Sequence, residues 1–207
     1  MSWNDVVVID SGGANLASVR FALERLGVAA EISTRAETIR SAGRVILPGV
    51  GAAGDVMGRL QALGLDEVIP ALTQPVLGIC VGLQVLYERC EEDDVNTLGL
   101  LPGTVRRLPS APGLSIPQMG WNRLHSRGEH PLLATLDADA HFYFVHSYAA
   151  PPGEGTLATA YHGSEFTALA GRGNFLATQF HPERSARWGH ELLNNFLHLP
   201  AEALSCA

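Results

Sequence analysis

The segment Gly78-Ile79-Cys80-Val81-Gly82 holds a thiol between two glycines, directly after the short apolar run Pro75-Val76-Leu77. Residues 83–88 have a helical pattern, so a strand is expected to turn sharply into a helix at Cys80. Such a nucleophile elbow lifts one side chain off the edge of a sheet towards solvent, and flanking glycines make room for its strained backbone. The partial positive charge of a helix N-terminus favours thiolate over thiol. The segment therefore predicts an enzyme with Cys80 as nucleophile.

A matching acid–base pair lies near the C-terminus, in Gln179-Phe180-His181-Pro182-Glu183, after the apolar run 175–178. A cysteine nucleophile needs a base that takes its proton and later protonates the leaving group, and histidine has the side-chain pKa nearest neutrality. A carboxylate two residues on can fix the tautomer of His181 and stabilise its cation. Because sites in parallel sheets form at the carboxyl ends of strands, we expect Cys80, His181 and Glu183 to meet as a triad.

An oxyanion hole is predicted from a third motif. Leu47-Pro48-Gly49-Val50-Gly51 interrupts another apolar run, and its glycines permit backbone conformations that other residues resist. The loop can therefore direct an N–H of Val50 or Gly51 at the reacting centre, beside the N–H of Val81 at the start of the predicted helix.

These motifs need a sheet to position them, and the first half of the chain alternates strands with helices. Apolar strands are expected at 6–9, 44–47 and 75–77, and helices at about 15–26, 60–72 and behind Cys80. Continuously apolar strands separated by amphipathic helices indicate a parallel sheet covered on both faces.

The pattern changes at about Gly103 to short β-rich segments at 104–108, 141–148, 156–161, 166–170 and 175–180. A terminal helix is expected from Ser185 to about Leu199. The prediction is an α/β fold: a doubly wound, mostly parallel sheet with helices on both faces and a β-rich C-terminal extension. It forms one domain over residues 1–200, followed by a loose tail at 201–207.

Composition narrows the class of function. The chain has 207 residues, 46% hydrophobic against 17% charged, which is an ordinary globular balance. A net charge of −7 without a Lys/Arg cluster argues against binding to nucleic acid or to an anionic membrane. Neither the three cysteines nor the histidines have the spacing of a disulfide framework or a metal site, so we expect no metal and no cofactor. Without an export signal or a long apolar segment, the expected location is the cytoplasm.

Together the Cys80 elbow, the loop 47–51 and the segment Gln179–Arg184 resemble class I, triad-type glutamine amidotransferases, and the likeness covers nearly the whole chain. Within that class, Met119-Gly120-Trp121-Asn122 and Tyr143-Phe144-Val145-His146-Ser147-Tyr148 resemble the glutaminase subunits of imidazole glycerol phosphate synthases, enzymes of histidine biosynthesis. The resemblance implies hydrolysis of L-glutamine to glutamate and ammonia through a thioester on Cys80. It also implies a heterodimer with a cyclase subunit, which uses the ammonia to make imidazole glycerol phosphate and aminoimidazole carboxamide ribotide.

The resemblance implies further roles for residues that sequence reasoning alone leaves open. Contacts with glutamine are implied for Gly49, Gln84, Glu92, His146, Ser147 and Tyr148. From the residues themselves, Gln84 can also be a half-buried polar residue, Glu92 can belong to a solvated acidic turn, and residues 146–148 can pack as an edge strand. Contacts with the partner are implied for Asn15, Gln118 and Arg184, and the family usually has His in place of Gln118 and Lys in place of Arg184.

Three other functions are compatible with parts of the sequence. They are an amidotransferase subunit of another synthase, such as those of folate, tryptophan or vitamin B6 synthesis; a free-standing γ-glutamyl hydrolase; and a silent flavodoxin-like binding module. The intact triad residues argue against the silent module, and residues 119–122 argue against the other synthases. The lack of a secretion signal argues against the hydrolase.

Overall fold

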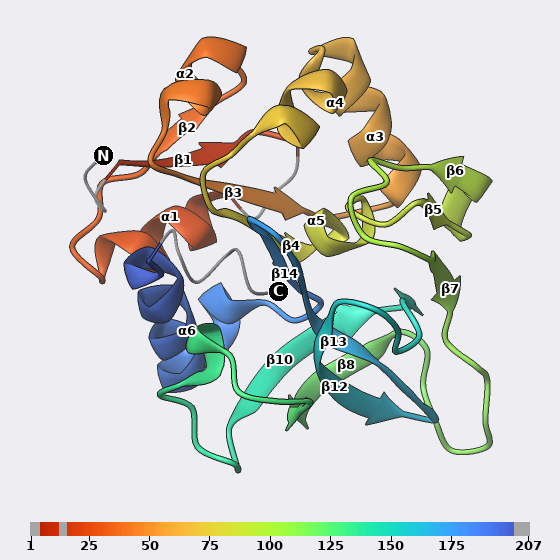
Figure 1. Cartoon of the computed structure of the whole chain (residues 1–207). Coiled ribbons are helices and arrows are strands. Elements are labelled where there is room, and N and C mark those ends of the chain that lie inside the picture. Colours follow the sequence, from red (N-terminus) through yellow and green to blue (C-terminus); the bar gives the residue numbers. More distant parts are fainter. Residues whose placement is uncertain (1–4, 13–15, 201–207) are drawn as a thin grey trace.

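An eight-stranded sheet forms the centre of the structure, a computed structural model that describes residues 5–12 and 16–200 (Figure 1). Its parallel part consists, in spatial order, of β2 (Glu31–Ser33), β1 (Val6–Ile9), β3 (Arg44–Gly49), β4 (Val76–Cys80) and β14 (Phe175–Thr178). Antiparallel strands extend it through β13 (Ser164–Arg172), β12 (Thr156–His162) and β9 (His125–Ser126). The predicted α/β fold, with a parallel core and a β-rich extension, is confirmed.

Helices cover both faces of the parallel strands. In Figure 1, α2 (Ala36–Ser41), α3 (Ala53–Ala62) and α4 (Leu65–Val68) lie on one side, and α1 (Leu16–Glu24) and α6 (Ala186–His198) lie on the other. Each long helix turns an apolar stripe inward, for example Leu192, Leu193 and Phe196 of α6. Covering both faces explains why strands such as β1 and β4 are buried along their whole length.

Two smaller sheets flank this core. β8 (Gln118–Arg123) pairs antiparallel with β10 (His141–His146), and the other sheet joins β11 (Tyr148–Ala149), β7 (Thr104–Arg107), β5 (Arg89–Cys90) and β6 (Val95–Asn96). The structure decides which face of β10 is inside. Phe142, Phe144 and His146 are buried, while Tyr143 and Val145 are half-buried.

Two predicted helices differ from the observed ones. The helix behind Cys80, α5 (Val81–Gln84), has only 4 residues. Its continuation is lost because the carbonyls of Val85 and Leu86 accept hydrogen bonds from the distant loop 98–101. The helix predicted at 60–72 begins earlier, at Ala53, and is interrupted at Gly64, which adopts a left-handed φ of 66°. After α4 the chain makes a 3-10 turn, η1 (Ile69–Ala71). The elements β2 and α2 were not predicted.

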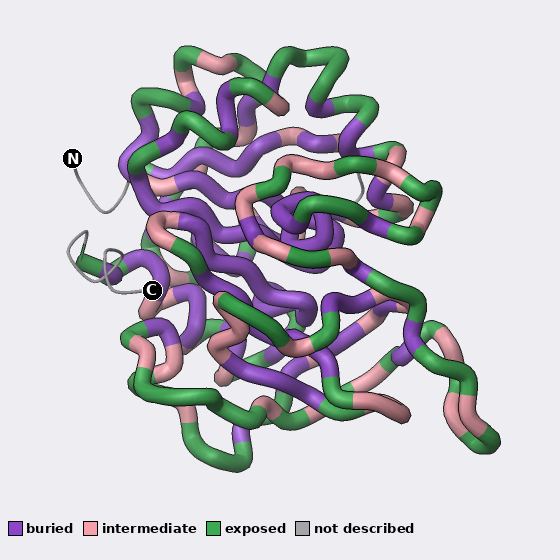
Figure 2. Tube along the Cα trace, turned by 45° about the vertical axis from the view of Figure 1, so that its right-hand side comes forward, coloured by how far each residue is buried: buried purple, intermediate pink, exposed green. Residues whose placement is uncertain are grey.

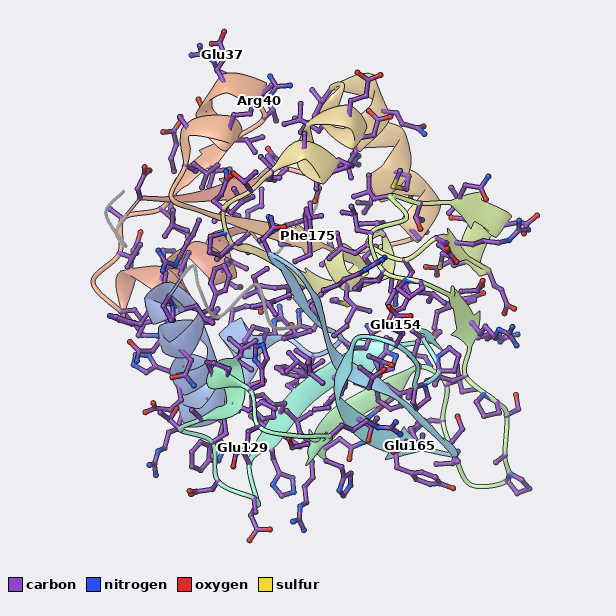
Figure 3. All side chains as sticks on the ribbon, in the orientation of Figure 1. Glu37, Arg40, Glu129, Glu154, Glu165 and Phe175 are labelled. Carbon is purple, nitrogen blue, oxygen red and sulfur yellow. The ribbon has the colours of Figure 1, made fainter. Side chains whose placement is uncertain are left out.

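One hydrophobic cluster runs through the described residues, from Val6 to Leu199. Figure 2 shows the central strands almost continuously buried, with the exposed positions at the rim. Phe175, at the start of β14, is buried, whereas Glu37, Arg40 and Glu129 point outwards (Figure 3). In the part of the chain that the structure describes, no helix has the length and apolarity needed to cross a membrane. The predicted tail, 201–207, lies outside the described residues.

Candidate active site

The ends of three neighbouring strands bring the predicted motifs together. Gly49, the last residue of β3, pairs with Cys80, the last residue of β4, and Thr178 of β14 pairs with Ile79. The loop after Gly49, the elbow at Cys80 and the segment 179–183 therefore leave the sheet at one edge. A parallel arrangement requires this, because all three strands run in the same direction.

The elbow has the strained backbone that the sequence predicts. Cys80 adopts φ 57° and ψ −109°, a conformation that costs of order 1–3 kcal/mol for a residue with a Cβ. Its neighbours are glycines because the backbone passes so close: a Cβ on Gly78 would lie 2.7 Å from the carbonyl oxygen of Gly82. A Cβ on Gly49 would lie 2.8 Å from Cβ of Val81. The loop after β3 is thus packed directly against the start of α5.

The setting of the thiol differs from the prediction in two respects. Cys80 is 5% exposed, so its side chain lies at the bottom of a cavity and does not project into solvent. With 4 residues, α5 also supplies a much weaker dipole than the longer helix expected behind Cys80. Stabilisation of a thiolate must therefore come mainly from neighbouring side chains and single N–H groups.

His181 and Glu183 form a buried pair. Nδ1 of His181 lies 2.7 Å from Oε1 of Glu183, within hydrogen-bond distance. Burial alone would lower the pKa of His181, but hydrogen bonds and charges from Cys80 and Glu183 outweigh it and raise the pKa to about 10. The imidazole is therefore a cation at neutral pH, hydrogen-bonded to the nucleophile on one side and to the carboxylate on the other.

Ser185 fixes the backbone of His181, a role that the sequence did not reveal. Its Oγ donates to the carbonyl of His181 at 2.6 Å and accepts from the N–H of Tyr143 at 2.9 Å. The N–H of His181 itself donates to the carbonyl of Tyr143 at 2.9 Å. His181 is thus held against β10 through its backbone. The sequence offered only a serine four residues downstream, at the start of the predicted terminal helix.

A cavity of about 400 Å³ opens above Cys80, a volume suited to an amino acid. The predicted oxyanion residues Val50, Gly51 and Val81 line it. So do most of the residues for which contacts with glutamine were implied, namely Gln84, Glu92, His146, Ser147 and Tyr148. Gly49 is the exception: it does not line this cavity, and its lack of a Cβ allows the loop to pack on Val81.

The loop 47–51 is held by a residue that follows β1. Oγ of Ser11, which is 2% exposed, donates to the carbonyl of Pro48 at 2.5 Å. Gly51, at the other end of the loop, adopts a φ of 88°, which favours glycine. The loop is thus anchored at Pro48 and free to take an unusual backbone conformation at Gly51.

Glu92 and His146 contribute different electrostatics to the cavity. Burial and the nearby Asp93 and Asp55 raise the pKa of Glu92, and a hydrogen bond from the N–H of Ala53 opposes this rise. Burial lowers the pKa of His146 to about 4, opposed by a hydrogen bond to the carbonyl of Tyr148, so its imidazole is neutral. The ring of His146 packs against Phe166, at 5.0 Å between centroids.

The predicted partner-facing residues are not all at the surface. Arg184 is exposed and lines the mouth of the cavity. Gln118 is 4% exposed, because its side chain points inward from β8, and the residues that this strand presents outward are Met119, Trp121 and Arg123. Asn15 lies outside the described residues.

Comparisons with known proteins agree with this geometry. Residues 7–199 match the family described as "Glutamine amidotransferase class-I". The chain belongs to the class I glutamine amidotransferase family. This amidotransferase is 53% identical over 195 residues to a protein named imidazole glycerol phosphate synthase subunit HisH from Xanthomonas oryzae pv. oryzae, covering 94% of this chain and 98% of that protein. It is 51% identical to the protein of the same name from Xylella fastidiosa, covering 95% and 98%.

Solved structures share the fold of this amidotransferase. A crystal structure of a glutamine amidotransferase superposes with a TM-score of 0.72 at 23% identity, covering 97% of this chain and 99% of that one. PurLQS from Thermotoga maritima superposes with a TM-score of 0.69 at 18% identity, covering 93% and 96%. The α/β core with its β-rich extension is therefore the fold of known amidotransferase structures.

Proposed function

We propose that this chain is the glutaminase subunit of an imidazole glycerol phosphate synthase. It would hydrolyse L-glutamine and deliver the ammonia to a cyclase subunit in histidine biosynthesis. The observation that carries the proposal is 53% identity over 94% of the chain to a protein of that name, in a chain whose Cys80 and His181 line one cavity and whose Glu183 contacts His181.

The geometry supports a two-stage reaction on Cys80. Its Sγ attacks the side-chain amide carbon of glutamine, and the backbone N–H groups of Val50, Gly51 and Val81, which line the cavity, would stabilise the oxyanion. The His181 cation then protonates the departing amine, so ammonia leaves and a γ-glutamyl thioester remains. Neutral His181 next takes a proton from water, which attacks the thioester and releases glutamate. Glu183 holds Nδ1 of His181 throughout.

Recognition of the amino-acid end of glutamine falls to the far wall of the cavity. Glu92 offers a carboxylate for the α-ammonium group, and its partial burial strengthens that attraction. The backbone of residues 146–148 lines the cavity beside Cys80, with the Val145 carbonyl 3.8 Å from Sγ.

The face beside the triad is suited to a heterodimer with the cyclase. Large apolar side chains are exposed on the described residues at only a few places: Phe21, Leu63, Met119, Trp121 and Tyr161. Met119 and Trp121, which are 65% and 54% exposed, share β8, and the Asn122 amide joins this strand to the carbonyl of Tyr161 at 2.9 Å. Trp121 also lies edge-on to Tyr143, the neighbour of His181. Exposed Arg184 adds a cation at the same place, next to Glu183.

Glutamate release tests the proposal directly. We would measure it for the purified chain, for the chain with a cyclase subunit, and for that complex with its acceptor nucleotide. A coupled subunit is slow alone and is stimulated by a partner that holds its acceptor nucleotide, because hydrolysis without an acceptor consumes glutamine to no use. Equal rates in all three would contradict the proposal. Arg184→Ala should weaken the stimulation, whereas Arg40→Ala, which changes an outward-pointing residue of α2, is the control. The reduced thiol on which the reaction depends fits a cytoplasmic location.

A further inference from the structure

Gln179 lies between the nucleophile and a residue of the substrate cavity. It follows β14 directly and is 0% exposed. Its Oε1 accepts from Nε2 of Gln84 at 3.3 Å, and its Nε2 donates to Sγ of Cys80 at 3.9 Å. One amide thus touches two groups of the site from the side of the core.

The direction of this chain of hydrogen bonds is fixed at its far end. The carbonyl oxygen of Tyr148 can only accept, so Nε2 of Gln84, at 3.0 Å, must be the donor there. The same Nε2 donates its other hydrogen to Gln179, so the atom of Gln179 that accepts it must be Oε1. Nε2 of Gln179 is left facing Sγ. Turning either amide over would set two donors or two acceptors against each other.

The arrangement leaves one acceptor without a partner. Both hydrogens of the Gln84 amide are engaged, and among the described residues Oε1 of Gln84 has no hydrogen-bond donor although it is buried. Gln84 lines the cavity above Cys80. A buried carbonyl oxygen without a donor is costly, and an N–H of a bound ligand would satisfy it.

The arrangement also makes Sγ of Cys80 an acceptor. A donor pointing at sulfur stabilises the thiolate more than the thiol, because hydrogen bonds to charged groups are the stronger ones. A protonated Cys80 still has an acceptor for its own hydrogen, the carbonyl of Val145 at 3.8 Å. Gln179 therefore favours the form of the thiol that attacks.

We propose that Gln179 is a positioning residue with two roles: it donates to the Cys80 thiolate, and it locks the Gln84 amide so that Oε1 accepts an N–H of the substrate. The second role rests on the proposed glutaminase function, whereas the first depends only on the chain itself. A glutamine is needed because no other side chain of this length offers an acceptor on one side and a neutral donor on the other.

Two substitutions separate the roles. Gln179→Met keeps the length and removes both donor and acceptor. Gln179→Glu keeps the acceptor that faces Gln84 but replaces the donor at Sγ by a carboxylate oxygen. The control is Gln74→Met, because Gln74, in the segment before β4, is also buried and donates to a backbone carbonyl, that of Ile39 in α2, at 2.9 Å. Urea unfolding of each variant establishes that it is folded.

The first measurement is the rate of Cys80 alkylation by iodoacetamide against pH, followed on the Cys80 peptide by mass spectrometry in the absence of glutamine. We expect Gln179→Met to react about tenfold more slowly at neutral pH, with the midpoint of the profile about one pH unit higher, which corresponds to the loss of one hydrogen bond to a charged group. Gln179→Glu should react at least as slowly as Gln179→Met, because a carboxylate oxygen facing the thiolate adds repulsion to the lost hydrogen bond. Gln74→Met should match the parent chain. If the Gln179→Met profile overlays that of the parent, the inference is overturned.

The second measurement is glutamine hydrolysis by the complex with the cyclase subunit. Gln179→Met should raise KM as Gln84→Met does, while Gln179→Glu should lower kcat and leave KM closer to the parent value. Equal KM values in the parent and in Gln179→Met would overturn the locking role. Shifted alkylation in a chain that never hydrolyses glutamine would contradict the proposed function and still support the role of Gln179 towards Cys80.

Discussion

Nδ1 of His181 lies 2.7 Å from Oε1 of Glu183, with only Pro182 between them in the chain. The side chains meet because His181 is still extended, at φ −100° and ψ 95°, while the next residues turn into the 3-10 segment η4 (Pro182–Arg184). Local backbone geometry therefore produces the contact between His181 and Glu183. The other contact of the triad, from His181 to Cys80, depends on the parallel pairing of β14 with β4.

Replacing the nucleophile should abolish hydrolysis and spare the fold. Cys80→Ala removes the atom that forms the thioester, so we expect glutamate release to fall by at least about 10⁴-fold. The side chain borders a cavity, so little packing is lost. Ammonia-dependent synthesis by the complex should persist, because that chemistry belongs to the partner. Near-normal glutamate release by Cys80→Ala would show that another group is the nucleophile.

His181 and Glu183 should act as a unit. His181→Ala removes the group that carries the proton. Glu183→Gln removes only the carboxylate charge that orients the imidazole of His181, so this change should lower kcat less than His181→Ala does. The double variant should be no more than about tenfold slower than His181→Ala alone, since most of the loss is shared. Steady-state kcat values of the three variants check this. Additive losses on a logarithmic scale would mean that the residues act independently.

The contribution of the His181–Glu183 pair to the unfolding free energy should fall between pH 6.5 and about 10. The pKa of His181 rises from 6.5 in the unfolded chain to about 10 in the folded chain, so its contribution is complete below pH 6.5 and is lost as the pH rises to about 10. The difference in unfolding free energy between the parent and Glu183→Gln should therefore shrink over that interval, with a slope of at most about 1.4 kcal/mol per pH unit.

Urea unfolding at several pH values between 6 and 10 measures this difference. Cys80→Ala, tested beside Glu183→Gln, reports how much of the effect comes through the thiolate. A difference that stays constant across the range would refute the linkage.

Gly49 and Gly58 should respond in opposite ways to alanine. A Cβ on Gly49 would lie 2.8 Å from both the Gly82 nitrogen and Cβ of Val81, so the oxyanion loop and the elbow must separate. We expect Gly49→Ala to cost about 1–3 kcal/mol of unfolding free energy and to slow hydrolysis. Gly58, inside α3, has nothing within 4 Å of an added Cβ, so Gly58→Ala should stabilise the chain by about 0.5 kcal/mol with unchanged activity. Thermal unfolding and glutamate release compare the two, and equal effects would contradict the packing argument.

The sequence by itself located the residues of the candidate site, because these residues stand in short local patterns. A thiol between glycines after an apolar strand, and a His-Pro-Glu after another, specify residue types and strand ends that hydrophobic periodicity can locate. It also determined the fold class, since continuously buried strands alternating with amphipathic helices permit few arrangements.

Only the tertiary structure decided features that depend on contacts between distant segments. It shortened α5, because loop 98–101 captures the carbonyls of Val85 and Leu86. It kept Gly49 out of the cavity lining, because the start of α5 packs against this glycine, and it turned the side chain of Gln118 inward from β8. It joined Gln179 to Gln84 and Cys80 through hydrogen bonds between three separate elements. Such contacts leave no periodic trace in the sequence, so they become visible only once the chain is folded.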